Sequence, residues 1–224
     1  MQDLTLIIPA KYEGESLPIF LNELSKFNFK KLIVLEESDK DTIDAIKNIH
    51  DIQILYQTNK GYGAALIEGI NNCSTDYFCI INADGSMDPN DVVKMYERIT
   101  TKELDFIFAS RYEKPIGGSD DDDVVTLIGN YFFTTIGNIF FSLKISDILF
   151  TFVMGNTSKF NKLNIKSRDF TFCVEFPIRA KRDGMIYETM PSYERSRIGG
   201  KKKVNPIVDG SLILIKMFKM FLFK

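Results

Sequence analysis

The side chains of this chain best suited to chemistry lie in the segment at residues 82–89 (NADGSMDP). The segment directly follows an apolar run at residues 77–81, which predicts a buried strand. Oxygen ligands at a strand end suit Mg²⁺ or Mn²⁺, and such ions usually bridge to substrate phosphates. The same residue types also form turns, and Asp88 before Pro89 could simply begin the next helix. The segment alone leaves both interpretations open.

The elements that would position this segment alternate along the first half of the chain. Apolar runs predict strands at residues 4–9, 31–35, 52–56, 77–81 and 105–109. Helical spacing predicts helices at residues 16–26, 40–50, 62–72 and 89–100. Strands that alternate with helices form a mostly parallel central sheet with helices on both faces, so the expected fold class is α/β.

The second half of the chain interrupts this order. Its pattern predicts helices at residues 124–143, 170–183 and 206–223, and a late strand at residues 185–191. The aspartate run at residues 120–123 predicts a solvated loop and is the best candidate for a boundary between the halves. We expect one domain over residues 1–210 and an appended basic, apolar helix over residues 211–224.

Carboxylates, glycines and cations follow the predicted strands. In open α/β sheets, ligands bind outside the carboxyl ends of the strands. Carboxylates there can bind a base, a ribose or a metal, and Lys or Arg can offset a diphosphate. This collective pattern is more specific than any one of its residues.

Four segments along this edge resemble successive motifs of family 2 glycosyltransferases. They are residues 7–13 (IIPAKYE), 59–65 (NKGYGAA), 82–89 and 109–112 (ASRY). The subgroup that they resemble most is that of the dolichyl-phosphate mannosyltransferases and polyprenyl-phosphate glucosyltransferases, over roughly residues 4–210. The resemblance implies a GT-A fold and sugar transfer with inversion from a nucleotide-diphospho-sugar.

On the donor side, the resemblance implies roles for individual residues. Those implied to surround the nucleotide are Pro9, Ala10, Glu13, Glu36, Lys60, Gly61, Gly63 and Ser86. Asp84 would bind the Mg²⁺ or Mn²⁺ that bridges the diphosphate, with Asn82 and Asp88 beside it. Asn82 stands where the family often has aspartate, so the metal site loses one charge. The second-strand motif also departs from the family pattern, which leaves UDP and GDP open as the nucleotide.

On the acceptor side, the resemblance places Arg111 near the active-site phosphates. Arg197, Gly200 and Lys203 match a family segment spaced R-x-x-G-x-S-K, near a donor or acceptor phosphate. A solvated charged loop is the alternative for residues 201–203.

Two acidic residues, Asp147 and Glu175, are candidate bases for a hydroxyl acceptor, and Glu175 matches a helix-borne glutamate of the family. Asp147 could equally be a helix cap and Glu175 an exposed helix residue.

Other kinds of chemistry have little raw material in this sequence. One histidine and three cysteines without metal-ligand spacing argue against zinc sites and Ser-His-Asp catalysis. The net charge of -2 and the absence of a recognised binding module argue against nucleic acid as a partner. The loop at residues 61–63 lacks the third glycine of a dinucleotide fingerprint. The odd cysteine count without a signal peptide predicts a cytoplasmic protein.

The C-terminal stretch at residues 211–223 is too short to span a bilayer. Its phenylalanines and lysines suit a helix at the membrane interface, and packing on the core is the alternative. Residues 124–143 approach membrane length, but their glycines and asparagines favour a buried or interfacial helix. We expect a peripheral protein at the cytoplasmic face of the membrane.

Together these features predict a metal-dependent inverting glycosyltransferase that uses a polyprenyl phosphate acceptor. Such an acceptor is already an anion and needs no general base. Two alternatives stay open: transfer to a saccharide hydroxyl in surface polysaccharide synthesis, and nucleotide-sugar binding without catalysis.

Overall fold

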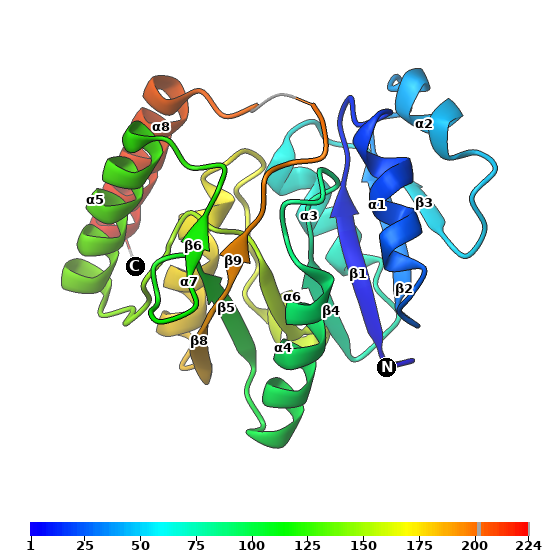
Figure 1. The fold of residues 1–224 in the computed structure, drawn as a ribbon. Coiled ribbons are helices and arrows are strands. Elements are labelled where there is room, and N and C mark those ends of the chain that lie inside the picture. Colours follow the sequence, from blue (N-terminus) through cyan, green and yellow to red (C-terminus); the bar gives the residue numbers. More distant parts are fainter. Residues whose placement is uncertain (201–202, 224) are drawn as a thin grey trace.

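A seven-stranded sheet runs through the centre of the molecule (Figure 1). The structure is a computed structural model that describes residues 1–200 and 203–223. The strands of this sheet are β1 (Leu4–Pro9), β2 (Lys30–Leu35), β3 (Gln53–Tyr56), β4 (Tyr77–Ile80), β5 (Phe106–Ser110), β7 (Val153–Asn156) and β8 (Tyr187–Pro191). Their order across the sheet is β3-β2-β1-β4-β7-β5-β8.

Most neighbouring strands in this sheet are parallel. β1 pairs in parallel with β2 and β4, β2 pairs with β3, and β5 pairs with β8. β1 (LTLIIP) and β5 (FIFAS) are almost wholly buried, as expected for strands covered on both faces. The predicted α/β class with a mostly parallel sheet is confirmed.

The exception is β7, which runs antiparallel between β4 and β5. The sequence pattern does not predict this strand, because its four residues (VMGN) carry neither an alternating nor a long apolar signal. Gly155 is needed there because rings from both neighbouring strands press against it. A Cβ atom at Gly155 would lie 2.3 Å from Cδ1 of Phe106 and 2.9 Å from Cζ of Phe78.

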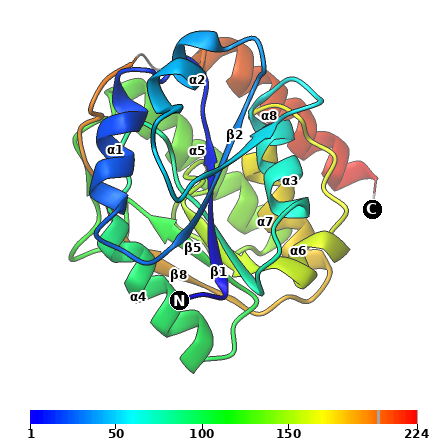
Figure 2. The same ribbon diagram turned by 90° about the vertical axis from the view of Figure 1, so that its right-hand side faces the viewer.

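Helices cover both faces of the sheet (Figure 2). One face packs against α1 (Ser16–Leu24), α2 (Lys40–Ile46) and α4 (Pro89–Thr101). The other packs against α3 (Tyr62–Asn71), α6 (Thr157–Lys162) and α7 (Phe172–Arg182). The strands and helices predicted in the first half are confirmed within a few residues, whereas α6 was not predicted.

Two long helices, α5 (Val124–Phe141) and α8 (Pro206–Leu222), lie side by side at one end of the sheet (Figure 1). Their inner faces join α7 in a third apolar cluster that includes Phe133, Ile213 and Met217. α8 is continuous, so the predicted boundary after residue 210 falls inside it. In the described part of the chain, α5 is the one helix long and apolar enough to cross a membrane, and about a fifth of that stretch (22%) is buried.

The aspartate run is a loop, as the sequence predicts, but it is only partly solvated: Asp120 and Asp123 are exposed, whereas Asp121 and Asp122 are partly buried. It follows β6 (Gly118–Ser119), which pairs in parallel with β9 (Tyr193–Glu194) from the end of the chain. Asp120 accepts a hydrogen bond from the Tyr193 hydroxyl (2.5 Å), and Asp123 caps α5 by accepting from the backbone N–H of Thr126 (2.7 Å). One carboxylate of the run thus binds a hydroxyl distant in sequence, and another caps the helix that follows it.

Replacing Gly155 with alanine should destabilise the protein by about 1–3 kcal/mol, because the new Cβ overpacks the sheet against Phe106. Gly129→Ala is the matched control: nothing lies within 4 Å of its Cβ position, and alanine should stabilise that helix by up to about 1 kcal/mol. Urea denaturation of both variants measures the difference. Equal stability of Gly155→Ala and the parent chain would contradict the packing described for β7.

Candidate active site

The strand order reverses between β1 and β4, which creates the switch point where open α/β sheets bind ligands. Pro9 and Ala10 end the first of these strands, and the Ala10 amide donates to the Val34 carbonyl (2.9 Å). The segment at residues 82–89 leaves the second, directly beside them, as the parallel β1–β4 pairing requires. The structure therefore brings the predicted nucleoside and metal segments together at this switch point, and the residues gathered there are called the crevice below.

Asp84 lies in a tight turn at this crevice and is 8% exposed. Its Oδ1 accepts the backbone N–H of buried Ser86 (3.1 Å), and Gly85 takes φ +75°, a conformation that favours glycine. The chain from Arg195 to Ile198 lies across this turn. The Ile198 amide donates to the Asp84 carbonyl and the Arg195 amide to the Ser86 carbonyl, each at 2.8 Å.

Arg197 lies between two carboxylates. Its Nη1 is 3.5 Å from Oδ2 of Asp84, and its Nη2 is 2.6 Å from Oδ2 of Asp121. A second bond joins its Nε to Oδ1 of Asp121 (3.1 Å). Oδ2 of Asp84, which does not accept from Ser86, thus faces a positive charge supplied by the chain itself, which marks this position as suited to a cation.

The oxygens around Asp84 fit a hard divalent ion only in part. The Asn82 Oδ1 accepts a hydrogen bond from Tyr62 (3.1 Å), and Asp88 caps α4 by accepting from the Asn90 amide (2.9 Å). Among the described residues, no group of three or more acidic, histidine or cysteine side chains could hold a metal by itself. An ion on Asp84 would take its remaining ligands from water or from a diphosphate.

The other end of the crevice holds Glu13, a carboxylate that is 7% exposed. It accepts from the Ser16 hydroxyl (2.5 Å) and forms an ion pair with Lys203. A Cβ atom at Gly200 would lie 3.1 Å from this carboxylate, so Gly200 also belongs to this group. The segment from residue 195 to 203 therefore contacts both ends of the crevice, although Lys201 and Lys202 lie outside the described residues.

The remaining donor-side residues lie at the ends of β2 and β3. Glu36 pairs with Lys11 at 3.1 Å, and Lys60 is exposed. Gly61 directly precedes α3 with φ +116°, and its Cβ position would be 2.2 Å from the Arg168 carbonyl oxygen. At Gly63 the corresponding approach to the Ser167 carbonyl oxygen is 2.4 Å. Both glycines are required because this loop packs directly on the backbone before α7.

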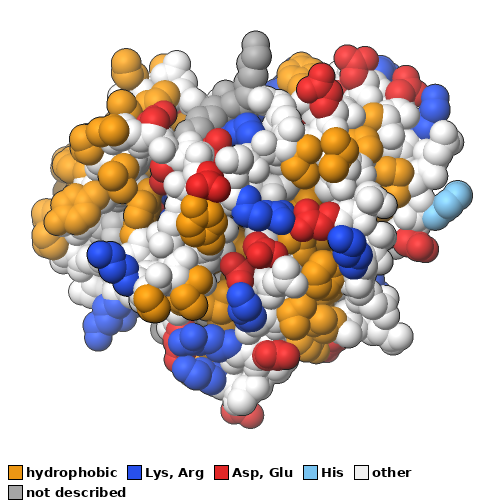
Figure 3. Space-filling model, viewed as in Figure 1, with side chains coloured by type: hydrophobic (Ala, Val, Ile, Leu, Met, Phe, Trp, Pro, Cys, Tyr) orange, Lys and Arg blue, Asp and Glu red, His pale blue; other side chains and the backbone are white. Residues whose placement is uncertain are grey.

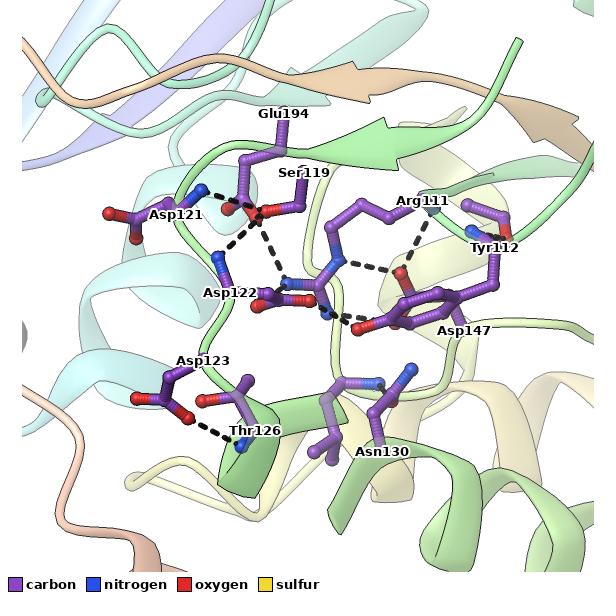
Figure 4. Close-up of polar contacts among 12 residues, drawn as sticks. Arg111, Tyr112, Ser119, Asp121, Asp122, Asp123, Thr126, Asn130, Asp147 and Glu194 are labelled. Carbon is purple, nitrogen blue, oxygen red and sulfur yellow. Dashed lines mark hydrogen bonds and ion pairs between the residues drawn. The ribbon is translucent and has the colours of Figure 1, made fainter. Parts of the chain in front are cut away.

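Arg111 directly follows β5 and lies 6% exposed among three carboxylates (Figure 4). Its Nε and Nη2 donate to Asp147 (2.7 and 3.0 Å), and its Nη1 donates to Asp122 (2.9 Å) and Glu194 (3.1 Å). Burial opposes the charged form of the guanidinium, yet the pairing with Asp147 raises the pKa of Arg111 above its ordinary value. Burial also raises the pKa of Glu194, against the lowering effect of Arg111.

This cluster decides how Asp147 can act. The carboxylate is 2% exposed, and both of its oxygens accept from the Arg111 guanidinium or amide. Asp147 therefore joins Arg111 in a separate, carboxylate-rich cluster, whereas Asp84 lies with Arg197. Asp121 connects the two, because it pairs with Arg197 while its neighbour Asp122 pairs with Arg111.

Glu175 lies away from both groups, in the first turn of α7. It is fully buried and not an exposed helix residue. Its Oε1 accepts from Arg179 (2.6 Å), and its Oε2 accepts from the Ser167 amide (2.7 Å) and Lys216 (2.9 Å). Although burial alone would raise its pKa, these donors, with Lys216 the strongest, lower the pKa of Glu175 to about 2.

Three residues of the crevice were not predicted from the sequence. Tyr62 donates to Asn82, Asp121 holds Arg197, and Arg195 donates to the Gly85 carbonyl (2.7 Å) while pairing with Glu23 (2.8 Å). The position of Tyr62 between Gly61 and Gly63, both predicted to border the nucleotide, is the sequence feature that could have indicated its role. Asp121 was hidden in a run of like charges.

Comparison with known proteins agrees with this geometry. The family model described as glycosyl transferase family 2 matches residues 5–163. An uncharacterized glycosyltransferase of Mycobacterium tuberculosis is 28% identical over 216 residues, which cover 96% of this chain and 95% of the relative. A UDP-N-acetylglucosamine–dolichyl-phosphate N-acetylglucosaminyltransferase of Methanococcus voltae is 24% identical over 161 residues, 58% of this chain and 64% of that protein.

Solved structures show the same fold. Glucosyl-3-phosphoglycerate synthase of Mycobacterium tuberculosis, in complex with Mn²⁺, UDP and phosphoglyceric acid, superposes with a TM-score of 0.74 at 13% identity and covers 99% of this chain and 79% of that one. S. aureus TarS in complex with UDP-GlcNAc gives a TM-score of 0.63 at 13% identity, covering 97% and 65%. The predicted GT-A fold is therefore confirmed. The chain belongs to glycosyltransferase family 2.

Proposed function

We propose that this protein transfers a sugar, with inversion, from a nucleotide-diphospho-sugar to a polyprenyl phosphate. The observation that carries the choice of acceptor is the state of the two candidate bases. Asp147 is committed to Arg111, and both oxygens of buried Glu175 accept from donors that lower its pKa and so make it a poor proton acceptor. A hydroxyl acceptor needs a free base to take its proton, whereas a phosphate acceptor does not.

The donor would occupy the crevice between β1 and β4. Pro9, Ala10, Glu13 and Glu36 would contact the nucleoside, and the glycine loop at residues 61–63, with Lys60, would border it. UDP is the first nucleotide to test, because the Methanococcus voltae relative is named for a UDP-linked sugar and the two solved neighbours bind UDP or UDP-GlcNAc. GDP is the competing donor in the same assay.

Asp84 would hold the divalent ion, with Asn82, Ser86 and Asp88 as the neighbouring oxygen groups. A bound Mg²⁺ or Mn²⁺ supplies charge stabilisation to a departing diphosphate. Asp84 fits this role because its Oδ2 already faces a cation.

The cations of the chain would act on the phosphates. Arg197 and Lys203, which pair with Asp84 and Glu13 in the absence of ligand, would turn to the donor and acceptor phosphates beside Gly200. An acceptor phosphate oxygen attacks the anomeric carbon from the face opposite the diphosphate. The bond from that carbon to the diphosphate oxygen breaks, and the nucleoside diphosphate leaves with the electron pair. Fixed positive charges at the phosphates stabilise the charge that develops there.

A lipid acceptor requires that the protein bind a membrane, and the outer faces of α5 and α8 are suited to such binding. Hydrophobic side chains gather at this end of the molecule in Figure 3, and those at least half exposed include Val124, Ile128, Tyr131, Ile139, Ile215 and Phe218. Exposed apolar surface of this extent, on helices with buried inner faces, suits binding at the headgroup boundary of a bilayer. The segments that lead into these helices contribute Asp121, three residues before α5, and Arg197, nine residues before α8, to the crevice. We therefore propose a peripheral protein at the cytoplasmic face of the membrane.

Asp84→Asn should lower transferase activity by about 100-fold or more, because it removes the charged ligand of the ion that stabilises the leaving group. Mn²⁺ titrations of UDP binding, followed calorimetrically, should show the same loss. Asp88→Asn is the matched substitution, since asparagine caps a helix as well as aspartate does. Retained activity limits Asp88 to capping α4, and a loss equal to that of Asp84→Asn makes it a metal ligand. An unaffected Asp84→Asn enzyme would contradict the metal site.

Arg197→Ala should lower kcat/KM for polyprenyl phosphate roughly 10- to 100-fold, the worth of one charge-assisted contact. The assay follows radiolabelled sugar from UDP- and GDP-linked donors into a lipid-phosphate product. Lys162→Ala removes a positive charge on α6 and should leave the rate unchanged. Transfer to a soluble saccharide with none to any lipid phosphate would favour the hydroxyl acceptor. Donor binding with neither transfer nor hydrolysis would favour a binding protein.

The double substitution Ile215→Glu and Phe218→Glu should abolish flotation with vesicles that contain anionic lipid. Both side chains are at least half exposed, so the variant should fold normally. Ile19→Glu places one glutamate on an exposed apolar position (56%) of α1, away from this surface, and should float like the parent chain. Flotation of the double variant, or its absence in the parent chain, would contradict the membrane surface.

A further inference from the structure

Lys216 of the C-terminal helix does not behave as a surface lysine. Its side chain is 24% exposed, and its amine lies 2.9 Å from the carboxylate of fully buried Glu175 on α7. Lys219, three residues further on the same helix, is exposed. A buried carboxylate is costly in free energy unless it is paired and hydrogen-bonded. The ion pair with Lys216 therefore helps Glu175 to remain charged in this buried position.

Glu175 uses that charge to hold a backbone segment. Its Oε2 accepts from the amides of Ser167 (2.7 Å) and Lys166 (3.2 Å), which begin the loop leading into α7. Arg179 fixes the other oxygen at 2.6 Å, which leaves the carboxylate one orientation. Lys216 and Glu175 together therefore hold the beginning of the loop at residues 166–170 in its position.

That loop is the support of the glycine loop. The Ala64 amide donates to the Arg168 carbonyl (2.9 Å), and both Gly61 and Gly63 approach the carbonyls of residues 167–168 too closely for any side chain. The Tyr62 ring stacks on Phe170 with 4.9 Å between ring centroids. These contacts leave no free space between the two segments. We therefore expect that a displacement of residues 166–170 also displaces residues 61–64.

Tyr62 connects the glycine loop to the predicted metal segment at residues 82–89. Its buried hydroxyl donates to Oδ1 of Asn82 (3.1 Å) and lies 2.6 Å from the Thr151 hydroxyl. A continuous set of contacts therefore runs from the C-terminal helix, through Glu175 and the loop at residues 166–170, to the glycine loop and the residue two positions before Asp84.

We infer that Lys216 and Glu175 are positioning residues for the nucleotide-sugar site, so that α8 is a structural component of the donor pocket as well as a surface helix. The assignment of the pocket to a nucleotide sugar rests on the proposed function, whereas the positioning itself is a property of the backbone. Loss of the Lys216 charge should loosen the glycine loop, weaken donor binding and leave the chemical step of bound donor intact.

The test is Lys216→Met in the full chain, with Lys219→Met as the control that removes a charge from the same helix. Amide hydrogen exchange should become faster at residues 61–66 and 166–170 in Lys216→Met alone. The KM for the nucleotide sugar should rise about 5- to 50-fold, the range of ordinary site coupling, while kcat changes less than twofold. Lys216→Arg should restore both measurements, because arginine can make the same ion pair.

Unchanged exchange in those segments, or a fall in kcat and melting temperature without a change in donor KM, would overturn the inference. Glu175→Gln, which keeps the side-chain shape, supplies the same comparison if Lys216→Met does not fold. Failure of the parent chain to bind any nucleotide sugar would refute the proposed function instead, and the exchange measurement would still decide the positioning role.

Discussion

The burial of the Arg111 guanidinium is the constraint around which the second half of the molecule is arranged. A cation removed from water costs several kcal/mol unless carboxylates replace its hydration. Here Asp122, Asp147 and Glu194 do so, and they come from three separate segments of the chain. The requirement of one side chain thus draws together the loop before α5, the loop before β7 and the strand β9 (Figure 4).

The same pairing rule governs the crevice. Asp84 and Glu13 each lie beside a cation from the segment at residues 195–203, so the ligand-free site has its charges internally matched. Under the proposed function, the phosphates of a donor would attract those cations, and an ion would replace the cation at Asp84. Binding would then exchange one set of ion pairs for another, so that no buried carboxylate is left without a counter-charge.

The first half of the fold could be predicted from sequence because buried parallel strands are long apolar runs, and because motif residues follow each strand directly. Pairings across the chain could not be predicted. Asp122 looks solvated beside three other aspartates, and its partner Arg111 becomes visible only in three dimensions. Glu175 has the sequence context of an exposed helical glutamate, and its burial depends on Lys216, 41 positions later (216 − 175). β7 is a strand because β4 and β5 flank it, not because of its own residues.

The position of β7 also sets an order of folding. The strands β3, β2, β1 and β4 are contiguous in the sheet and are all synthesised by residue 80. β5 follows soon after in sequence but can reach them only through β7, which ends at Asn156. β5 therefore has neither of its sheet neighbours until the 46 further residues (156 − 110) to the end of β7 have been synthesised, and its second neighbour, β8, follows only at Tyr187–Pro191. We expect the FIFAS strand to be exposed to aggregation or to chaperone binding in that interval, because it is apolar and has no strand to pair with.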